Sequence, residues 1–312
     1  MQINLMKKTK EFYYHRYDAI PVHIKTIIRP VINGLYFLRF SRSLWYHRSF
    51  ARIVPNPRYV IPRNLGFAKI DFQPNELIYK AVDSANKILI NHKQISTKIT
   101  GKSYLRTIAN ISDFDPEDPI VQIAMNSELL SCVAKYLGVA PQLNSINVMW
   151  SPALEINKAE YGSWTGSQLF HIDGDSDGIV KIWILCNQVD EDNGPTVLIP
   201  ADKSLKISKD ISYSPKGKVK DDTPFISVMP EAFRAVGEPG TMFATDTARC
   251  FHQGSRTKIN SERLVIMYYF DTFRSSWYLS DYQRPTLNRS NKWSLFISNL
   301  PNHKKNLFRM LK

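Results

Sequence analysis

From Pro141 onward, the sequence is a series of short apolar runs, rich in β-branched and aromatic residues, with turn residues between them. Such runs are typical of β-strands, and their close spacing favours a sandwich or barrel over alternating strands and helices. Strands are predicted at residues 143–150, 179–189, 196–200, 240–245 and 263–270. This pattern predicts that the central part of the chain is mainly β.

The segment before Pro141 has a different periodicity. Apolar residues recur at helical spacing from Pro74 to about His92, again from Asp118-Pro119, and from Ser127 to Tyr136, where Leu137-Gly138 provides a glycine stop. The lysine-rich stretch 202–222 has few apolar residues and is predicted to be a surface loop. The predicted fold class is therefore mainly β with flanking helices.

Composition limits the class of protein. The 312 residues are 43% apolar, which favours one large ordered domain. Three cysteines lie far apart in apolar runs, a usage that indicates neither a disulfide framework nor a zinc site and fits a reducing compartment. The sequence has no apolar run of the roughly 18 residues that a membrane span needs, and it starts without a signal peptide pattern. A cytoplasmic location is expected.

Positive charge is concentrated at the start of the chain. Residues 1–63 contain twelve Lys or Arg but only two acids, so they carry ten of the thirteen net positive charges. Residues 1–65 are predicted to form a basic, aromatic-rich helical appendage, residues 66–283 the main domain, and residues 284–312 a basic tail. The appendage either packs on the main domain or makes peripheral contact with an anionic membrane through residues 1–63. Nucleic acid is not expected as a partner, because no nucleic-acid-binding motif is present.

A candidate metal site is indicated by three residues. In an extended segment, His171 and Asp173 project to the same side, and His252 precedes another strand-like run. Two imidazoles and one carboxylate on one side of a metal leave the opposite side open, which suits non-haem Fe(II) that also binds a cosubstrate and O₂. The His-x-Asp pair alone is a weak signal.

A candidate anion site accompanies these three residues. Arg263 follows His252 by eleven residues and starts a predicted strand. A guanidinium binds a carboxylate with two directional, charge-assisted hydrogen bonds. Arg263 is therefore a candidate anchor for a dicarboxylate such as 2-oxoglutarate.

Taken together, these motifs resemble the phytanoyl-CoA dioxygenase (PhyH) family of Fe(II)/2-oxoglutarate oxygenases over about residues 66–275. The resemblance rests on His171-Ile172-Asp173, Asp192-Asn193-Gly194-Pro195-Thr196, Ile199-Pro200, Gly240-Thr241-Met242-Phe243, Asp246, His252 and Arg263. It implies a double-stranded β-helix (a cupin-like jelly roll), iron held by His171, Asp173 and His252, and 2-oxoglutarate held by Arg263. One departure is Ala201-Asp202-Lys203-Ser204, where members often have Pro-Gly-Ser-His, and it leaves the substrate open.

The resemblance also implies an activity and a wider pocket. The expected reaction is hydroxylation of an unactivated C–H, because Asp173 occupies the position that related halogenases leave free for chloride. Gln168, Asn147, Thr196 and Ser255 are expected to line the cosubstrate or substrate pocket, and Lys181 either reaches it or extends to its rim. The basic rim points to an anionic small-molecule or lipid-linked substrate. Two alternatives stay open, namely a non-catalytic metal or small-molecule binder with this fold, and a membrane or polyanion adaptor acting through the basic arms.

Overall fold

The computed structural model describes residues 56–72, 75–95, 102–153, 164–173, 178–214, 217–220, 223–272 and 291–308, together with Pro21, Ile24, Ile27 and Ser49. The predicted basic appendage, and with it the predicted membrane contact of residues 1–63, lies almost entirely outside the described residues. The same holds for residues 273–290, between the last strand and the C-terminal helices.

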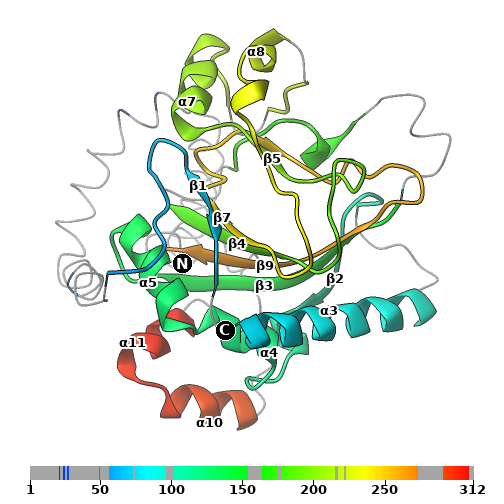
Figure 1. The fold of residues 1–312 in the computed structure, drawn as a ribbon. Coiled ribbons are helices and arrows are strands. Elements are labelled where there is room, and N and C mark those ends of the chain that lie inside the picture. The colour runs from blue at the N-terminus through cyan, green and yellow to red at the C-terminus, as the bar shows by residue number, and fades with distance from the viewer. Residues whose placement is uncertain are drawn as a thin grey trace, which may run out of the picture.

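A large antiparallel sheet forms the centre of the molecule (Figure 1). In the described part of the chain it has six strands, in the order β1-β7-β4-β9-β3-β2. Their bounds are β1 Phe67–Ile70, β2 Arg106–Asn110, β3 Gln142–Ser151, β4 Ile179–Leu185, β7 Met242–Thr245 and β9 Arg263–Asp271. The strand predictions at 143–150 and 263–270 are confirmed almost to the residue. The one at 179–189 is too long, because the backbone leaves the sheet after Leu185.

A smaller sheet faces the large one. It contains β5 Val197–Leu198, β6 Phe233–Arg234 and β8 His252–Gln253 in the order β6-β5-β8. Residues Phe170 and His171 extend it, because His171 forms an antiparallel bridge with His252 and Phe170 forms one with Val219.

The pairing of the strands defines the topology. The first strand of the double layer, β3, pairs with the last, β9, and the next segment, residues 170–171, pairs with β8. Further inward along the chain, β4 pairs with β7 and β5 pairs with β6. This nested antiparallel pairing, divided between two sheets, is that of a jelly roll. The expected double-stranded β-helix is thus confirmed by the chain's own strand order.

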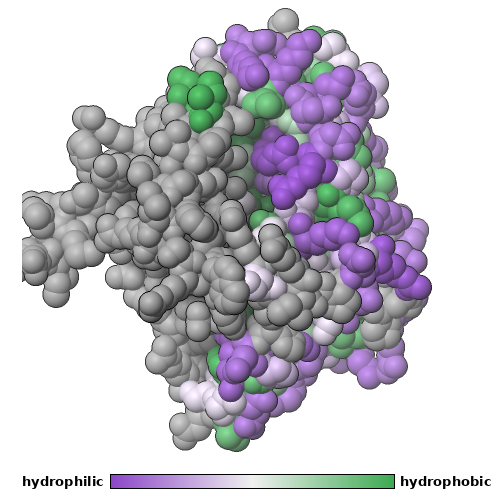
Figure 2. Space-filling model, turned by 90° about the vertical axis from the view of Figure 1, so that its left-hand side faces the viewer, coloured by the Kyte–Doolittle hydropathy of each residue, from purple (hydrophilic) through white to green (hydrophobic). Residues whose placement is uncertain are grey.

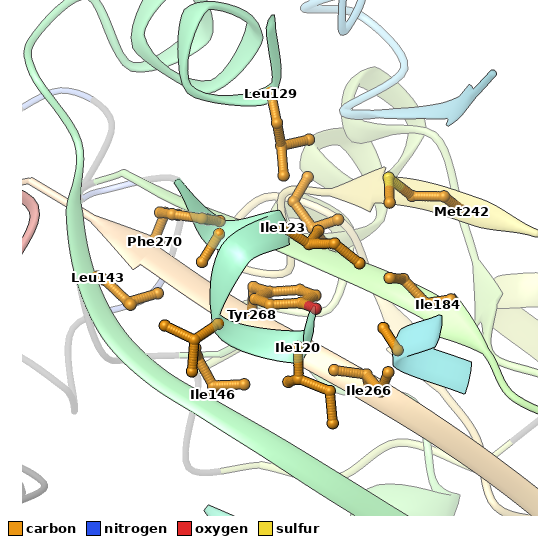
Figure 3. Packing of buried hydrophobic residues seen from close by; sticks show 14 of the residues in the cluster. Ile120, Ile123, Leu129, Leu143, Ile146, Ile184, Met242, Ile266, Tyr268 and Phe270 are labelled. Carbon is orange, nitrogen blue, oxygen red and sulfur yellow. The ribbon is translucent and has the colours of Figure 1, made fainter. Parts of the chain in front are cut away.

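Helices cover the outer face of the large sheet. They are α3 Asn75–Ile95, α4 Pro119–Ala124 and α5 Ser127–Leu137, in good agreement with the predicted helices. Gly138 ends α5 with a φ of 71°, a left-handed conformation that glycine adopts without strain. Alternate residues of β9, among them Ile266, Tyr268 and Phe270, point to these helices and form the main core (Figure 3). The other set of alternate residues faces the smaller sheet, and the candidate site lies there.

The expectation of a surface loop at residues 202–222 is wrong for its first half. The structure has helix α7, Ala201–Asp210, which packs with α8, Thr223–Ile226, on the outer face of the smaller sheet. Its buried face is made of Ala201, Ser204, Ile207 and Ser208, so small polar residues replace the apolar stripe that sequence patterns detect. Ser204 explains how a polar face can be buried, since its Oγ donates to Ile199 O at 3.0 Å and accepts from Phe251 N at 2.8 Å.

The C-terminal segment packs on the helical side of the large sheet. It contains α10 Asn291–Asn299 and α11 Asn302–Lys305. Trp293, Leu307 and Phe308 join the main core, and the Trp293 indole N–H donates to Phe114 O at 3.0 Å. The described part of the predicted basic tail is therefore attached to the main domain.

On the face seen in Figure 2, the described surface is mainly hydrophilic, with hydrophobic residues in small groups. Hydrophobic residues scattered in this way are usual on a protein surface. Within the described ranges, no helix has the length and apolar character that a bilayer span requires.

Candidate active site

The two predicted histidine ligands lie side by side between the sheets. His171 N donates to His252 O at 3.0 Å, and His252 N donates to His171 O at 2.9 Å. This bridge places the imidazole centroids 4.1 Å apart. The contact explains how residues separated by 81 positions reach one site, since β8 and the 170–171 segment are neighbours in the smaller sheet.

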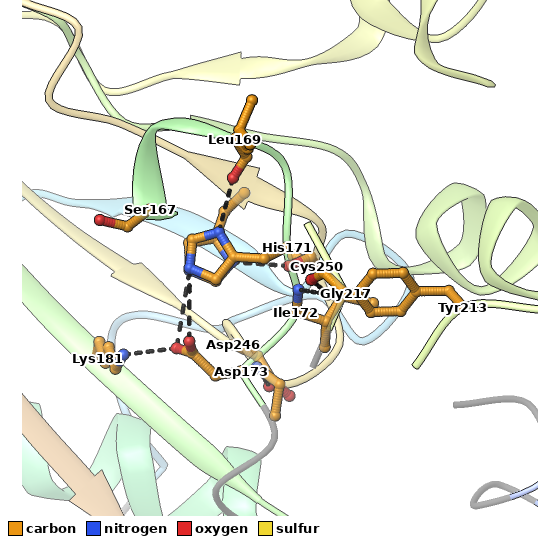
Figure 4. A network of polar contacts seen from close by, with 12 residues as sticks. Ser167, Leu169, His171, Ile172, Asp173, Lys181, Tyr213, Gly217, Asp246 and Cys250 are labelled. Atoms are coloured by element: carbon orange, nitrogen blue, oxygen red, sulfur yellow. Dashed lines mark hydrogen bonds and ion pairs between the residues drawn. The ribbon is translucent and has the colours of Figure 1, made fainter. Parts of the chain in front are cut away.

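Asp173 completes a compact group with the two imidazoles. Its backbone N–H donates to Thr247 O at 2.9 Å, which fixes the segment just after the bridge. The distances are 3.8 Å from Oδ1 to His171 Nε2 and 3.7 Å from Oδ2 to His252 Nε2. Figure 4 shows His171 and Asp173 facing each other. One ligand atom from each residue lies within 4.8 Å of the others. Because ligand atoms held at about 2.1 Å from one metal lie roughly 3 Å apart, small side-chain shifts suffice for binding.

Backbone carbonyls orient both imidazoles. Nδ1 of His171 lies 2.9 Å from Leu169 O, and Nδ1 of His252 lies 3.1 Å from Cys250 O. A carbonyl only accepts, so each Nδ1 carries the proton and each Nε2 is left with a free lone pair. In both rings it is the Nε2 atom that faces Asp173. Such carbonyl contacts are the usual partners of metal-bound histidines.

The protonation states suit a metal ion. Burial lowers the pKa of His171 to about 3, and burial also lowers that of His252. For Asp173, burial raises the pKa, but the Lys181 ammonium and the two imidazoles outweigh it, so the net shift is downward. At neutral pH the site therefore offers two neutral imidazoles and one carboxylate, the forms that bind metals.

Arg263 forms a second polar site at the start of β9. It faces inward and is only 4% exposed. Its Nη1 donates to Thr196 Oγ1 at 3.0 Å and its Nη2 to Ser255 Oγ at 2.9 Å. Burial lowers its pKa to about 10, so it is still a cation at neutral pH.

The charge of Arg263 is not balanced by a carboxylate in the described part of the chain, where its hydrogen-bond partners are hydroxyl groups and its Nε has none. A buried cation without a counter-charge is costly. Arg263 is therefore still a candidate anion-binding residue.

The backbone around this site has an unusual conformation. Ser255 has a φ of 63°, which is uncommon for a residue other than glycine, and its hydroxyl also accepts from Ser151 Oγ at 3.0 Å. Strain of this kind tends to occur at functional positions. The backbone also packs closely at Gly194, where a Cβ would lie only 2.4 Å from the Arg256 backbone N, so a glycine is needed there.

The remaining predicted pocket residues differ in position. Thr196 and Ser255 contact Arg263 directly. Gln168 lies one step further away, since its Nε2 donates to Ser255 O at 2.9 Å. Asn147 lies on the inward side of β3, where its Nδ2 donates to Ser145 Oγ at 3.2 Å, and no described contact joins it to the other site residues.

Two contacts of the site have little or no signal in the sequence. Lys181 Nζ lies 2.6 Å from Asp173 Oδ2, and the only sequence signal for its inward position is the alternation with Val180 and Ile182. Ser151 contacts Ser255, and its proximity follows from the pairing of Ser151 with Arg263 between β3 and β9, a register that the sequence alone does not provide.

Asp246 supports the loop that leads from β7 to β8. Its Oδ1 accepts from Ala248 N at 3.1 Å and its Oδ2 from the Tyr136 hydroxyl at 2.7 Å. Arg249 Nη1 donates to the same hydroxyl at 3.1 Å. The loop carries Thr247, whose carbonyl accepts from Asp173 N, so the network supports one side of the candidate metal site from helix α5.

Tyr136→Phe is expected to lower the free energy of unfolding by about 1.5–3 kcal/mol, because a hydrogen bond to a buried charged group is lost. The affinity for a divalent metal should fall as well, since partners behind the ligands hold them in place. Urea denaturation of the metal-free protein and metal titration measure the two effects. Tyr79→Phe on the exposed face of α3 is the matched control. An unchanged unfolding free energy would contradict a supporting role for the hydroxyl.

Comparisons with known proteins find solved structures with a similar fold, but no similar sequence. No protein-family model matches the chain, and no curated protein matches it. EctD from S. alaskensis with bound Fe is 12% identical over 68% of this chain and 74% of EctD, with a TM-score of 0.47. The non-haem monooxygenase ThoJ is 12% identical over 80% and 96%, with a TM-score of 0.48. SnoN, a non-haem α-ketoglutarate-dependent epimerase from nogalamycin biosynthesis, is 12% identical over 71% and 80%, with a TM-score of 0.43.

By its strand pairing and inward side chains, the chain is a double-stranded β-helix protein with a candidate metal site of two imidazoles and one carboxylate. Of the three structures above, EctD is described with bound Fe, and ThoJ and SnoN are described as non-haem enzymes. At these identities, and with TM-scores below 0.5, the likeness says nothing about the chemistry of this chain.

Proposed function

We propose that this protein is an Fe(II)- and 2-oxoglutarate-dependent oxygenase that hydroxylates an unactivated C–H bond. The observation that carries the proposal is the combination of a His-Asp-His group with a buried arginine that has no carboxylate partner in the described chain. Either feature alone would also be compatible with a purely structural role. Together they provide a metal site with an open side and a separate anchor for a dicarboxylate.

His171 Nε2, His252 Nε2 and a carboxylate oxygen of Asp173 would hold the iron. Two nitrogen donors and one oxygen donor on one side of the metal fit Fe(II) and leave the other coordination positions for small ligands. When bound, the iron supplies the coupled reaction in which O₂ and 2-oxoglutarate give succinate and CO₂ while the second oxygen atom enters the substrate C–H bond as a hydroxyl group.

Arg263 binds the carboxylate of 2-oxoglutarate that is remote from the keto group, through its guanidinium. Thr196 and Ser255 hold the guanidinium in plane from two sides. The fixed fork positions a flexible dicarboxylate in one pose, which is the main contribution a protein makes to such chemistry. The inward Met149, Trp183 and Met267 provide an apolar wall that excludes water from the reaction.

The substrate is proposed to be a small or lipid-linked molecule with an anionic group. The support is the positive charge of Lys181 and Lys218, which acts on the buried histidines, together with the basic character of residues 1–63. Peripheral membrane contact through residues 1–63 is part of the same proposal. Co-sedimentation with anionic and neutral vesicles, with and without these residues, tests that part.

Succinate release tests the reaction itself. Wild-type protein supplied with Fe(II), ascorbate, O₂ and 2-oxoglutarate is expected to produce succinate, and His171→Ala is expected not to. A protein that binds metal and 2-oxoglutarate but releases no succinate, even slowly, would instead be the non-catalytic binder. Binding of neither ligand would exclude both functions.

Gly254 is expected to reserve space for the bound carboxylate. Its φ is not left-handed, so glycine is not needed there for the backbone. A Cβ at 254 would lie 3.3 Å from Thr196 Oγ1 and 3.5 Å from both Nη atoms of Arg263. Gly254→Ala should therefore weaken 2-oxoglutarate binding roughly tenfold, the effect of one misplaced methyl group, without changing metal affinity.

Calorimetric titration of 2-oxoglutarate into the Mn(II)-loaded protein measures this effect. Gly178→Ala is a matched control, because its Cβ would make ordinary contacts, at 3.4 Å to Leu137 and 3.5 Å to Thr272. Equal 2-oxoglutarate affinity in wild type and Gly254→Ala would place the carboxylate elsewhere.

A further inference from the structure

Lys181 is a cation in an unusual place. It lies on β4 between Val180 and Ile182, both fully buried in the core on the helical side of the sheet. Strand alternation therefore turns Lys181 to the inner face, where its side chain is only 14% exposed. A lysine in such a place is rare unless its charge is paired.

Its partner is the carboxylate of the candidate metal site. Lys181 Nζ lies 2.6 Å from Asp173 Oδ2 and 5.3 Å from the centroid of the Tyr269 ring. The contact with Asp173 is drawn in Figure 4. Lys181 pairs in register with Tyr269 on β9 and with Thr245 on β7, so two strands fix its backbone. The ammonium is thus built into the wall of the site.

The Lys181 ammonium is unfavourable for metal binding at this site. A positive charge a few ångströms from a divalent cation repels it, and it also withdraws charge from the carboxylate that binds it. Stability alone gives no strong reason for the ion pair either, since replacing a buried pair with apolar residues is often neutral or stabilising. The position of Lys181 therefore indicates a role other than metal retention.

The two oxygens of Asp173 indicate what that role is. Oδ1 lies 3.8 Å from His171 Nε2 and Oδ2 lies 3.7 Å from His252 Nε2, so each oxygen is near one imidazole and the carboxylate can offer both to one metal. Carboxylates bind metals through one oxygen or through two. The Lys181 contact occupies Oδ2 and leaves only Oδ1 without a cation.

We propose that Lys181 is a positioning residue that holds Asp173 through Oδ2, so that the carboxylate binds the metal through Oδ1 alone. A carboxylate bound through both oxygens would take one more coordination position. With Lys181 in place, that position stays open for the cosubstrate and O₂. This inference rests on the proposed function for its purpose, but its effect on metal coordination does not depend on that function.

Binding of Co(II) tests the proposal without turnover. In Lys181→Met the repelling charge is gone and both oxygens are free, so Co(II) should bind roughly tenfold more tightly or better, and its visible absorption spectrum should report a changed coordination. The affinity of the Co(II)-loaded variant for 2-oxoglutarate should fall roughly tenfold, because a position is blocked and an attractive charge is lost. Lys181→Arg, which keeps charge and donors, should stay close to wild type in both.

A rise in Co(II) affinity together with a fall in 2-oxoglutarate affinity distinguishes this positioning role from a structural one. If Lys181 only stabilised the fold, Lys181→Met would lower the melting temperature and leave Co(II) affinity and spectrum as in wild type, or weaken binding. That result would overturn the proposal, and Lys181→Gln provides the same comparison if the Met variant does not fold. If wild type binds Co(II) but not 2-oxoglutarate, the proposed function fails, while tighter Co(II) binding with an altered spectrum in Lys181→Met still supports the positioning role.

Discussion

Asp173→Ala is expected to abolish both metal binding and succinate release. The variant loses the one anionic residue of the candidate triad. It leaves two neutral imidazoles, with ring centroids 4.1 Å apart, beside the Lys181 ammonium. Loss of a group that merely supports a ligand already costs about 10- to 100-fold in metal affinity, so loss of the ligand should cost more. Metal content after dialysis, Co(II) titration and succinate release measure the effect.

The same substitution should also destabilise the metal-free protein, for a separate reason. Without Asp173, Lys181 is a nearly buried cation whose ion-pair partner has been removed, which typically costs about 3–5 kcal/mol. The double variant Asp173→Ala/Lys181→Met removes that unpaired charge, so it should recover stability without recovering metal binding. Asp192→Ala, which breaks an exposed ion pair with Lys258, should change little in either measurement.

Metal binding at wild-type strength in Asp173→Ala would show that the three residues are not a metal site. Equal stability of the single and double variants would show that Lys181 finds another partner. The two results are independent, so the ligand role and the ion pair are tested separately.

The elements that the sequence predicted well are those with local signals. Helices α4 and α5 have caps within their own segments, where the Asp118 and Asn126 side chains accept from backbone N–H groups and Gly138 ends the second helix. Strands β3 and β9 are long and apolar, so their pattern identified them without knowledge of their partners. The pairing of His171 with Asp173 could be predicted in the same way, because strand alternation alone brings their side chains to one side.

What the sequence could not predict depends on contacts between distant segments. Helix α7 has a buried face with only one large apolar residue, Ile207, and it is stabilised by the Ser204 hydroxyl, which hydrogen-bonds to Ile199 O and Phe251 N of the smaller sheet. The ion pair between Lys181 and Asp173 requires the 170–173 segment to lie over β4, which follows from the pairing of His171 with His252. Both features are consequences of nested strand pairing, which has no local sequence signal.

Arg263→Met is expected to remove 2-oxoglutarate binding while leaving metal binding intact. Arg263 is 4% exposed and binds Thr196 and Ser255, so no other described cation makes the same contacts at that end of β9. Deleting one partner of a buried, hydrogen-bonded charge pair costs about 2–5 kcal/mol, or roughly 30-fold or more in the dissociation constant. Calorimetric titration of 2-oxoglutarate into the Mn(II)-loaded variant measures it. Arg263→Lys keeps the charge but loses the planar fork, so its affinity should be intermediate.

The stability of the ligand-free variant distinguishes an anion anchor from a structural cation. In the described structure Arg263 has no carboxylate to balance its charge, and its Nε is buried without a hydrogen-bond partner. Replacing it with an apolar residue of similar length should therefore leave the free energy of unfolding unchanged or raise it. Arg234→Met, which breaks an exposed ion pair with Glu191, is the control. Strong destabilisation of Arg263→Met together with unchanged 2-oxoglutarate affinity would mean that Arg263 supports the fold and that the cosubstrate, if bound, is held elsewhere.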